Sequence, residues 1–131
     1  MPPPELFLRL ELYGGRLGPG KVALLEHIRD TRSLAASARA LGMSYKRAWE
    51  LLAALNAMFD EAVTVSYPGR NVAGATELTP FGERVIALFR AVERGAAQAT
   101  AAAVQELADA SRRAPRGRAP APARRRAAPP T

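Results

Sequence analysis

A short polar and basic segment, Ser44-Tyr45-Lys46-Arg47, carries the side chains with the most evident chemistry. Arginine can donate two hydrogen bonds to O6 and N7 of guanine, worth about 1–3 kcal/mol of discrimination between bases, and lysine can contact a base or a phosphate. The hydroxyl groups of Ser44 and Tyr45 are further donors at the same place. The segment is therefore a candidate for contacting DNA. The alternative is that the two cations only solvate the end of a helix.

Two larger side chains, Trp49 and Glu50, follow one helical turn later. Trp49 can pack on a sugar or a thymine methyl group, and Glu50 can accept a hydrogen bond from N4 of cytosine. The sequence supports a position of Trp49 in the core or between helices as well as it supports a contact to DNA. Glu50 can also act simply by tuning the charge of the patch.

Three residues outside this segment are further candidates for contacts to DNA. Arg70 and Asn71 lie in a loop rich in glycine and proline, from which they can reach the minor groove or a phosphate. A loop tip without a role is the alternative for both. Ser33, together with the amide groups of the helix that it caps, can bind a backbone phosphate.

Enzymatic chemistry finds little support in the sequence. The segment Gly15–Val22 nearly fits the phosphate-binding pattern G-x-x-x-x-G-K-[ST], but valine at the last position lacks the hydroxyl that would hold Mg²⁺. No parallel α/β pattern follows it. His27 is the single histidine and the chain has no cysteine, so neither a metal site nor nucleophilic catalysis is expected. We expect no enzyme, no catalytic residues, no metal and no cofactor.

Length and charge predict one small domain with a cationic appendage. The chain has 131 residues, 19 basic and 12 acidic side chains, and a net charge of +7. Seven arginines follow residue 110 without an acidic residue, so they account for the whole excess, and any DNA-binding surface on the neutral body must be a local patch. No signal peptide and no run of roughly 20 apolar residues is present, which predicts a cytoplasmic protein without a membrane partner.

The candidate residues around position 45 belong to two predicted helices joined by a tight turn. Ser33 is placed to cap a helix over residues 34–41, Gly42 and Met43 form the turn, and Ser44 is placed to cap a helix over residues 45–59. This order is the sequence form of a helix-turn-helix. Apolar residues at helical spacing predict the buried face of the second helix: Ala48, Leu51, Leu52, Leu55 and Phe59.

Shorter elements are predicted on both sides of this pair. Before it, alternation predicts a strand over 6–12, glycines predict a turn over 13–20, and spacing predicts a helix over 21–30. After it, a strand over 62–66 and a partner strand over 75–78 predict a hairpin, as in the wing of a winged helix.

A long helix is predicted after the hairpin. Thr79 can cap it and Pro80 suits its first position, and the helix can extend through the alanine-rich segment 96–110. Such a helix would span about 45 Å, too long for one small domain to bury, so part of it is expected to pack on a second copy. The segment 111–131 is predicted to be a disordered tail that adds sequence-independent affinity for DNA. The apolar stripe of the helix consists of Phe81, Val85, Leu88, Phe89 and Val92.

Four segments resemble the N-terminal DNA-binding domain of the ModE family. They are Leu17–Leu25, Ser33–Ala38, Met43–Trp49 (the most diagnostic) and Leu78–Arg84, the last also shared in looser form with LysR-type regulators. The resemblance covers residues 6–95. It implies a bacterial transcription factor with a winged helix-turn-helix that dimerises through the helix after the wing. In the family this domain precedes molybdate-binding modules, of which this sequence shows no counterpart, so molybdate binding is not expected and only a link to molybdenum metabolism by descent remains.

The sequence thus predicts a mainly α fold with a small β element: a winged helix-turn-helix over 1–95, a helical extension over 96–110 and a tail over 111–131. The predicted function is a homodimeric transcriptional regulator that binds double-stranded DNA. Two alternatives remain. An architectural, nucleoid-type protein would bind random and selected duplexes equally. A winged-helix protein-interaction module would shift no duplex at low salt.

Overall fold

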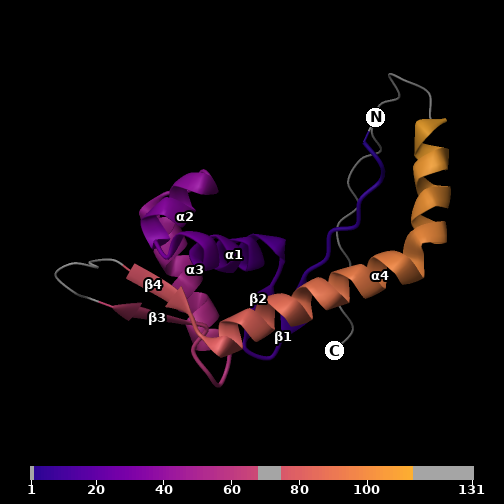
Figure 1. The fold of residues 1–131 in the computed structure, drawn as a ribbon. Coiled ribbons are helices and arrows are strands. Elements are labelled where there is room, and N and C mark those ends of the chain that lie inside the picture. The colour runs from indigo at the N-terminus through magenta and orange to yellow at the C-terminus, as the bar shows by residue number, and fades with distance from the viewer. Residues whose placement is uncertain (1, 68–74, 114–131) are drawn as a thin grey trace, which may run out of the picture.

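The structure, a computed structural model, describes residues 2–67 and 75–113 of the chain. Within these residues the predicted fold class, a mainly α winged helix with a long C-terminal helix, is confirmed (Figure 1). The predicted tail and the loop that holds Arg70 and Asn71 lie outside the described residues, apart from the tail's first three positions. The elements are β1 (Leu10–Leu12), β2 (Gly15–Leu17), α1 (Pro19–Thr31), α2 (Leu34–Ala40), α3 (Tyr45–Met58), β3 (Thr64–Tyr67), β4 (Ala75–Leu78) and α4 (Pro80–Arg112).

The helix-turn-helix of α2 and α3 forms as predicted, with both hydroxyl caps in place. The Ser33 side chain accepts a hydrogen bond from the amide of Ala36 at 3.0 Å, and that of Ser44 accepts one from the amide of Arg47 at 3.0 Å. Gly42 has a φ of +67°, a left-handed conformation that glycine adopts without steric cost and that allows the tight turn. Each cap satisfies an amide that the helix itself cannot pair.

The core lies between α1, α2, α3 and the start of α4. On α3 the predicted residues Ala48, Leu52 and Leu55 are buried, whereas Leu51 and Phe59 are only partly buried. Met58, which the predicted face omits, is buried instead of Phe59 because α3 ends at residue 58 and the chain turns away. The other buried apolar residues are Leu17, Val22, Leu24, Leu25, Ile28, Leu34, Ala38, Val63, Val85, Ile86 and Phe89.

A small hairpin before α1 differs from the prediction. The predicted strand over 6–12 is shortened to β1, and the predicted turn over 13–20 is wrong, because only its start turns and β2 follows antiparallel to β1. Gly14 lies in this turn against α3, where a Cβ atom would come within 2.0 Å of the carbonyl oxygen of Met58. The hairpin is thus packed closely on the end of α3.

The β3–β4 hairpin, which corresponds to the wing, is fastened to the helices at its base. The Oδ1 atom of Asn56 on α3 accepts hydrogen bonds from the amides of Val63 (2.8 Å) and Thr64 (3.2 Å), and its Nδ2 atom donates to the Thr64 hydroxyl (3.0 Å). On the other strand the amide of Thr76 donates to the carbonyl of Arg32 at 3.0 Å. The base of the hairpin is therefore held to α3 and to the α1–α2 connection.

Helix α4 begins with the predicted cap and continues without a break to Arg112. The Thr79 hydroxyl accepts from the amide of Gly82 (3.0 Å) and donates to the carbonyl of Ala62 (2.7 Å). Its first half packs on the domain, and its second half changes direction and projects from it (Figure 1). The Thr100 hydroxyl donates to the carbonyl of Ala96, a contact of the kind that bends helices.

Candidate nucleic-acid interface

The predicted DNA-contacting residues of α3 all lie on the surface. Ser44, Tyr45, Lys46, Arg47 and Glu50 are exposed, and Tyr45 retains 57% of its accessible surface. Trp49 is 56% exposed, so its alternative placement in the core is wrong. The structure thus brings these six residues together on the first turns of one helix.

Within the part of the chain that the structure describes, the two cations of this surface have no ion-pair partner. Neither Lys46 nor Arg47 forms an ion pair with a residue in the ranges 2–67 and 75–113. The backbone amide of Arg47 donates to the Ser44 hydroxyl, so the Arg47 residue is part of the helix cap through its backbone alone. Two cations at an exposed helix start are therefore available for an anionic or hydrogen-bond-accepting partner.

The helical period divides the surface of α3 into an outer ridge and two flanks. At 100° per residue, Lys46 and Glu50 share the ridge, and the residues that continue it are small. Ala53, Ala54 and Ala57 are all exposed. Methyl groups at these positions allow another surface to approach the helix axis closely.

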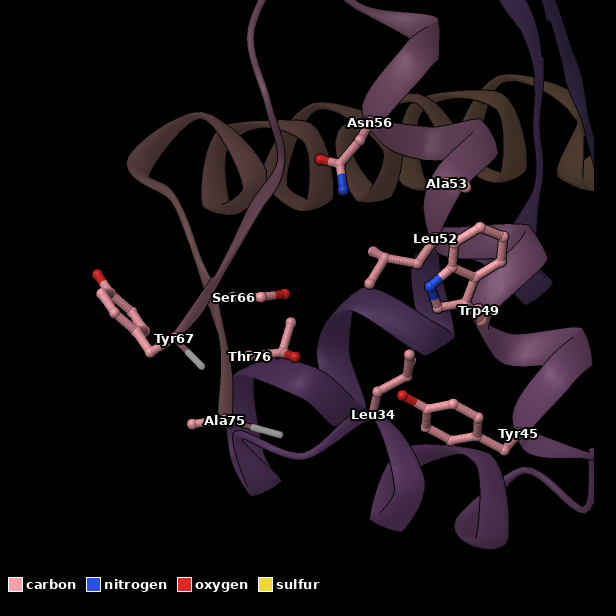
Figure 2. Close-up of a pocket in the computed structure, with 10 residues that line it drawn as sticks. All are labelled: Leu34, Tyr45, Trp49, Leu52, Ala53, Asn56, Ser66, Tyr67, Ala75 and Thr76. Carbon is pink, nitrogen blue, oxygen red and sulfur yellow. The ribbon is translucent and has the colours of Figure 1, made fainter. Parts of the chain in front are cut away.

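A groove of about 400 Å³ runs along the flank of α3 that faces the wing (Figure 2). Tyr45 and Trp49 stand on the α3 side of this groove, and Ser66 and Thr76 face them from β3 and β4. Ring faces and hydroxyl groups in this combination suit a sugar–phosphate strand. The remaining lining residues are Leu34, Leu52, Ala53, Asn56, Tyr67 and Ala75.

The other predicted site residues are more distant or outside the described chain. Ser33 is half-buried and its side chain is used as the α2 cap, while its backbone bridges to Ala75 of β4. Arg70 and Asn71 lie outside the described residues. The wing-side residues Ser66 and Thr76 were not predicted; they are paired with each other across β3 and β4, a register that the residues of either strand alone do not signal.

The segment that nearly fits a phosphate-binding loop does not form such a loop. Gly15–Leu17 is strand β2, and only Gly18 separates it from α1. A one-residue connection cannot wrap around the phosphates of a nucleotide.

Two other features, a metal-binding cluster and a membrane-spanning helix, are absent from the residues that the structure describes. Across the described ranges, no group of three or more His, Cys, Asp or Glu side chains is arranged to hold a metal ion. In those same ranges no helix has the length and apolar character needed to cross a membrane.

The chain is similar to several curated proteins, while no family model matches it. It is 43% identical over 89 residues to the molybdenum-pterin-binding protein MopB of Rhodobacter capsulatus, covering 68% of this chain and 33% of that protein. It is 34% identical over 80 residues to the molybdenum transport protein ModE of Azotobacter vinelandii, covering 61% and 30%. It is 31% identical over 86 residues to the DNA-binding transcriptional dual regulator ModE of Escherichia coli K12, covering 65% and 33%.

The chain therefore spans about a third of the length of the curated relatives that it matches. At the family level the names of the ModE relatives from Yersinia pestis and Escherichia coli describe transcriptional regulators rather than enzymes. The homologues of this chain are ModE and the MopA and MopB proteins, and its similarity is to the N-terminal region of the ModE family.

Proposed function

We propose that this chain is a DNA-binding transcriptional regulator that reads duplex DNA with α3. The observation that carries the proposal is the exposed start of α3, where Lys46 and Arg47 have no ion-pair partner among residues 2–67 and 75–113, on a helix whose outer ridge continues past Glu50 with alanines. A relative from Escherichia coli is named as a DNA-binding transcriptional regulator, which supports the same function here.

In this proposal the ridge of α3 enters the major groove, whose width of about 12 Å admits a helix. Lys46, Arg47 and Glu50 then face base edges, and the groove between α3 and the wing receives one sugar–phosphate strand. We assign Ser33 to a backbone phosphate, and Arg70 and Asn71, which follow β3 in the sequence, to the minor groove or a phosphate.

The proposed active form is a homodimer. An apolar groove of about 340 Å³ lies between the β1–β2 hairpin and α4, and Leu88 and Val92 on its rim are 48% and 41% exposed. A second copy that covers this groove would give two recognition helices. Their half-sites would be inverted and about one helical turn of DNA, or a multiple of it, apart.

The names of the relatives also support a role connected with molybdenum. The Azotobacter vinelandii relative is a molybdenum transport protein by name, and the Rhodobacter capsulatus relative is named for binding molybdenum-pterin. We assign the chain to regulation of molybdenum-related genes by this descent, without assigning molybdate binding to any of its described residues. As a bacterial regulator of this kind, it would act in the cytoplasm, where the DNA is.

The test is selection of bound duplexes from a random pool, followed by Lys46→Ala and Arg47→Ala on the selected site. Each variant should lose about 5- to 150-fold of its preference for the selected duplex over a scrambled one, because a bidentate base contact is worth about 1–3 kcal/mol. Arg94→Ala, which removes an exposed cation from α4, is the matched control and should bind like the wild type.

Three outcomes would contradict the proposal. Unchanged discrimination in both variants would mean that α3 is not the reading helix. Equal affinity of the wild type for random and selected duplexes would indicate an architectural protein. Failure to bind any duplex at low salt would indicate a protein-interaction module.

A further inference from the structure

A second depression lies on the flank of α3 that faces away from the wing. Its volume is about 420 Å³, and it is bordered by the β1–β2 hairpin, the start of α1, and Arg47 and Leu51 of α3. Three more cations line it, namely Arg9, Arg16 and Lys21. We call Arg9, Arg16, Lys21 and Arg47 the basic pocket. None of its lining residues is acidic.

Local interactions hold three of these cations, Arg9, Arg16 and Lys21, without neutralising the cluster. Glu11, which pairs with Arg16 across the hairpin, lies 3.1 Å from the Nε atom of Arg16 and 3.5 Å from that of Arg9. The ammonium group of Lys21 donates to the carbonyl of Arg16 at 2.6 Å. One carboxylate is thus shared by two arginines, and within the described ranges neither Lys21 nor Arg47 has a carboxylate partner. The pocket keeps a net positive charge.

The backbone beside the pocket also carries partial positive charge. Helix α1 has Gly18 as its N-cap, with no side-chain hydrogen bond to the first turn, and that turn contains no acidic residue. The first amides of a helix have no partner within the helix. They therefore add partial positive charge next to the four cations.

The position of the pocket indicates what it binds. A helix in the major groove is bordered by a sugar–phosphate strand on each side. The groove toward the wing is suited to one of these strands, and the basic pocket lies on the opposite flank of the same helix. Arg47 belongs both to the exposed start of α3 and to the wall of the pocket, so the two surfaces are continuous.

We propose that the basic pocket binds a backbone phosphate of the DNA strand that borders the major groove on the side away from the wing. This inference rests on the proposed function, because it requires α3 to lie in the groove. The glycine- and lysine-containing segment that resembles a nucleotide-binding loop then serves a phosphate of the DNA backbone. Contacts of this kind position the protein and add affinity that does not depend on sequence.

The test uses Lys21→Gln and Arg16→Gln in the full chain, with Arg94→Gln as the matched control. Affinity for the selected and the scrambled duplex is measured by fluorescence anisotropy between about 50 and 200 mM salt. Over this range each phosphate contact adds to the decrease of affinity with salt. Each pocket variant should weaken binding to both duplexes by the same factor, roughly 3- to 10-fold, and reduce the slope of log K against log salt by about 1. The control should change neither quantity. Far-ultraviolet circular dichroism checks that each variant is folded. If Lys21→Gln does not fold, Arg16→Gln still tests the pocket, because Arg16 is exposed and its replacement is not expected to disturb the fold.

Several results would overturn the inference. Unchanged affinity and slope for both pocket variants, with Arg47→Ala still losing discrimination, would refute the phosphate pocket and leave the proposed function standing. Weaker binding to the selected duplex alone would mean that the pocket reads bases. Lys21-dependent binding of ATP, with duplex binding unaffected, would make it a nucleotide site. Absence of any duplex binding by the wild type would instead refute the proposed function.

Discussion

At the scale of single residues, Arg90 is the side chain that ties the long helix to the domain. Its Nε atom lies 3.3 Å from a carboxylate oxygen of Glu26 on α1, and its Nη1 atom lies 2.6 Å from Glu93 on α4. The hydrogen bond to Glu26, followed by that to Glu93, raises the pKa of Arg90 above its ordinary value. Both Arg90 and Glu26 are about 30% exposed, so water screens their attraction only in part.

Glu26→Gln should lower the free energy of unfolding by about 1–2 kcal/mol, because the charged hydrogen bonds between α1 and α4 become weaker. Since the folded-state pKa of Arg90 is raised, its contribution is complete at every pH below the ordinary arginine pKa and is lost only at more alkaline pH. The loss should therefore be equal at pH 7 and pH 9. Urea unfolding measures it, with Glu106→Gln on the exposed end of α4 as control. A loss no larger than that of the control would contradict this role.

At the scale of elements, the helices were predictable and the first hairpin was not. Hydroxyl caps at Ser33, Ser44 and Thr79 and the 3.6-residue period are local signals, and they placed α2, α3 and α4 within a residue or two of their observed ends. Strand β2 has only three residues, begins with glycine and is stabilised by pairing with β1 and by packing on α3. Nothing in its own residues signals a strand.

The candidate interface likewise has one part that the sequence predicts and one part that it does not. The exposed start of α3 could be predicted, because a cap and a period determine which residues of a helix face outward. The basic pocket could not, because it joins cations from the residue before β1, from β2, from α1 and from α3. They are separated by up to 38 positions and meet only when the hairpin folds against α1 and α3. Charge counting along the chain shows a neutral body and hides this local concentration.

Replacing either of two glycines of α4 by alanine should change the stability of the protein in opposite directions. A Cβ atom at Gly82 would lie 2.2 Å from the carbonyl oxygen of Val63, whereas one at Gly95 would meet nothing within 4 Å. Gly82→Ala should therefore lose about 1–3 kcal/mol of stability through overpacking against the backbone. Gly95→Ala should gain up to about 1 kcal/mol through helix propensity. Thermal unfolding compares the two, and equal stability of both variants would show that α4 does not start in close contact with the residue before β3.

At the scale of the whole molecule, α4 is the helix whose apolar side chains are left exposed on both its packed and its projecting half. Its projecting half carries Leu107, which is 71% exposed, and its packed half borders the apolar groove beside Leu12 and Phe81. On the same helix, Pro3, Pro4 and Leu6 of the N-terminal segment line a pocket together with Ala97, Thr100 and Val104 of α4. Exposed apolar surface gathered along one helix is typical of an interface between proteins.

Leu88→Glu combined with Val92→Glu should convert the proposed dimer into a monomer, because burying either carboxylate in the apolar groove without a partner is strongly unfavourable. Analytical ultracentrifugation measures the change, and Gln98→Glu, on an exposed position of the same helix, is the control and should remain dimeric. The double variant should bind a duplex with two half-sites at least about tenfold more weakly, since the two recognition helices are no longer linked, while its affinity for one half-site stays unchanged. A monomeric wild type would refute the proposed dimer, whereas a double variant that still sediments as a dimer would place the contact between copies elsewhere.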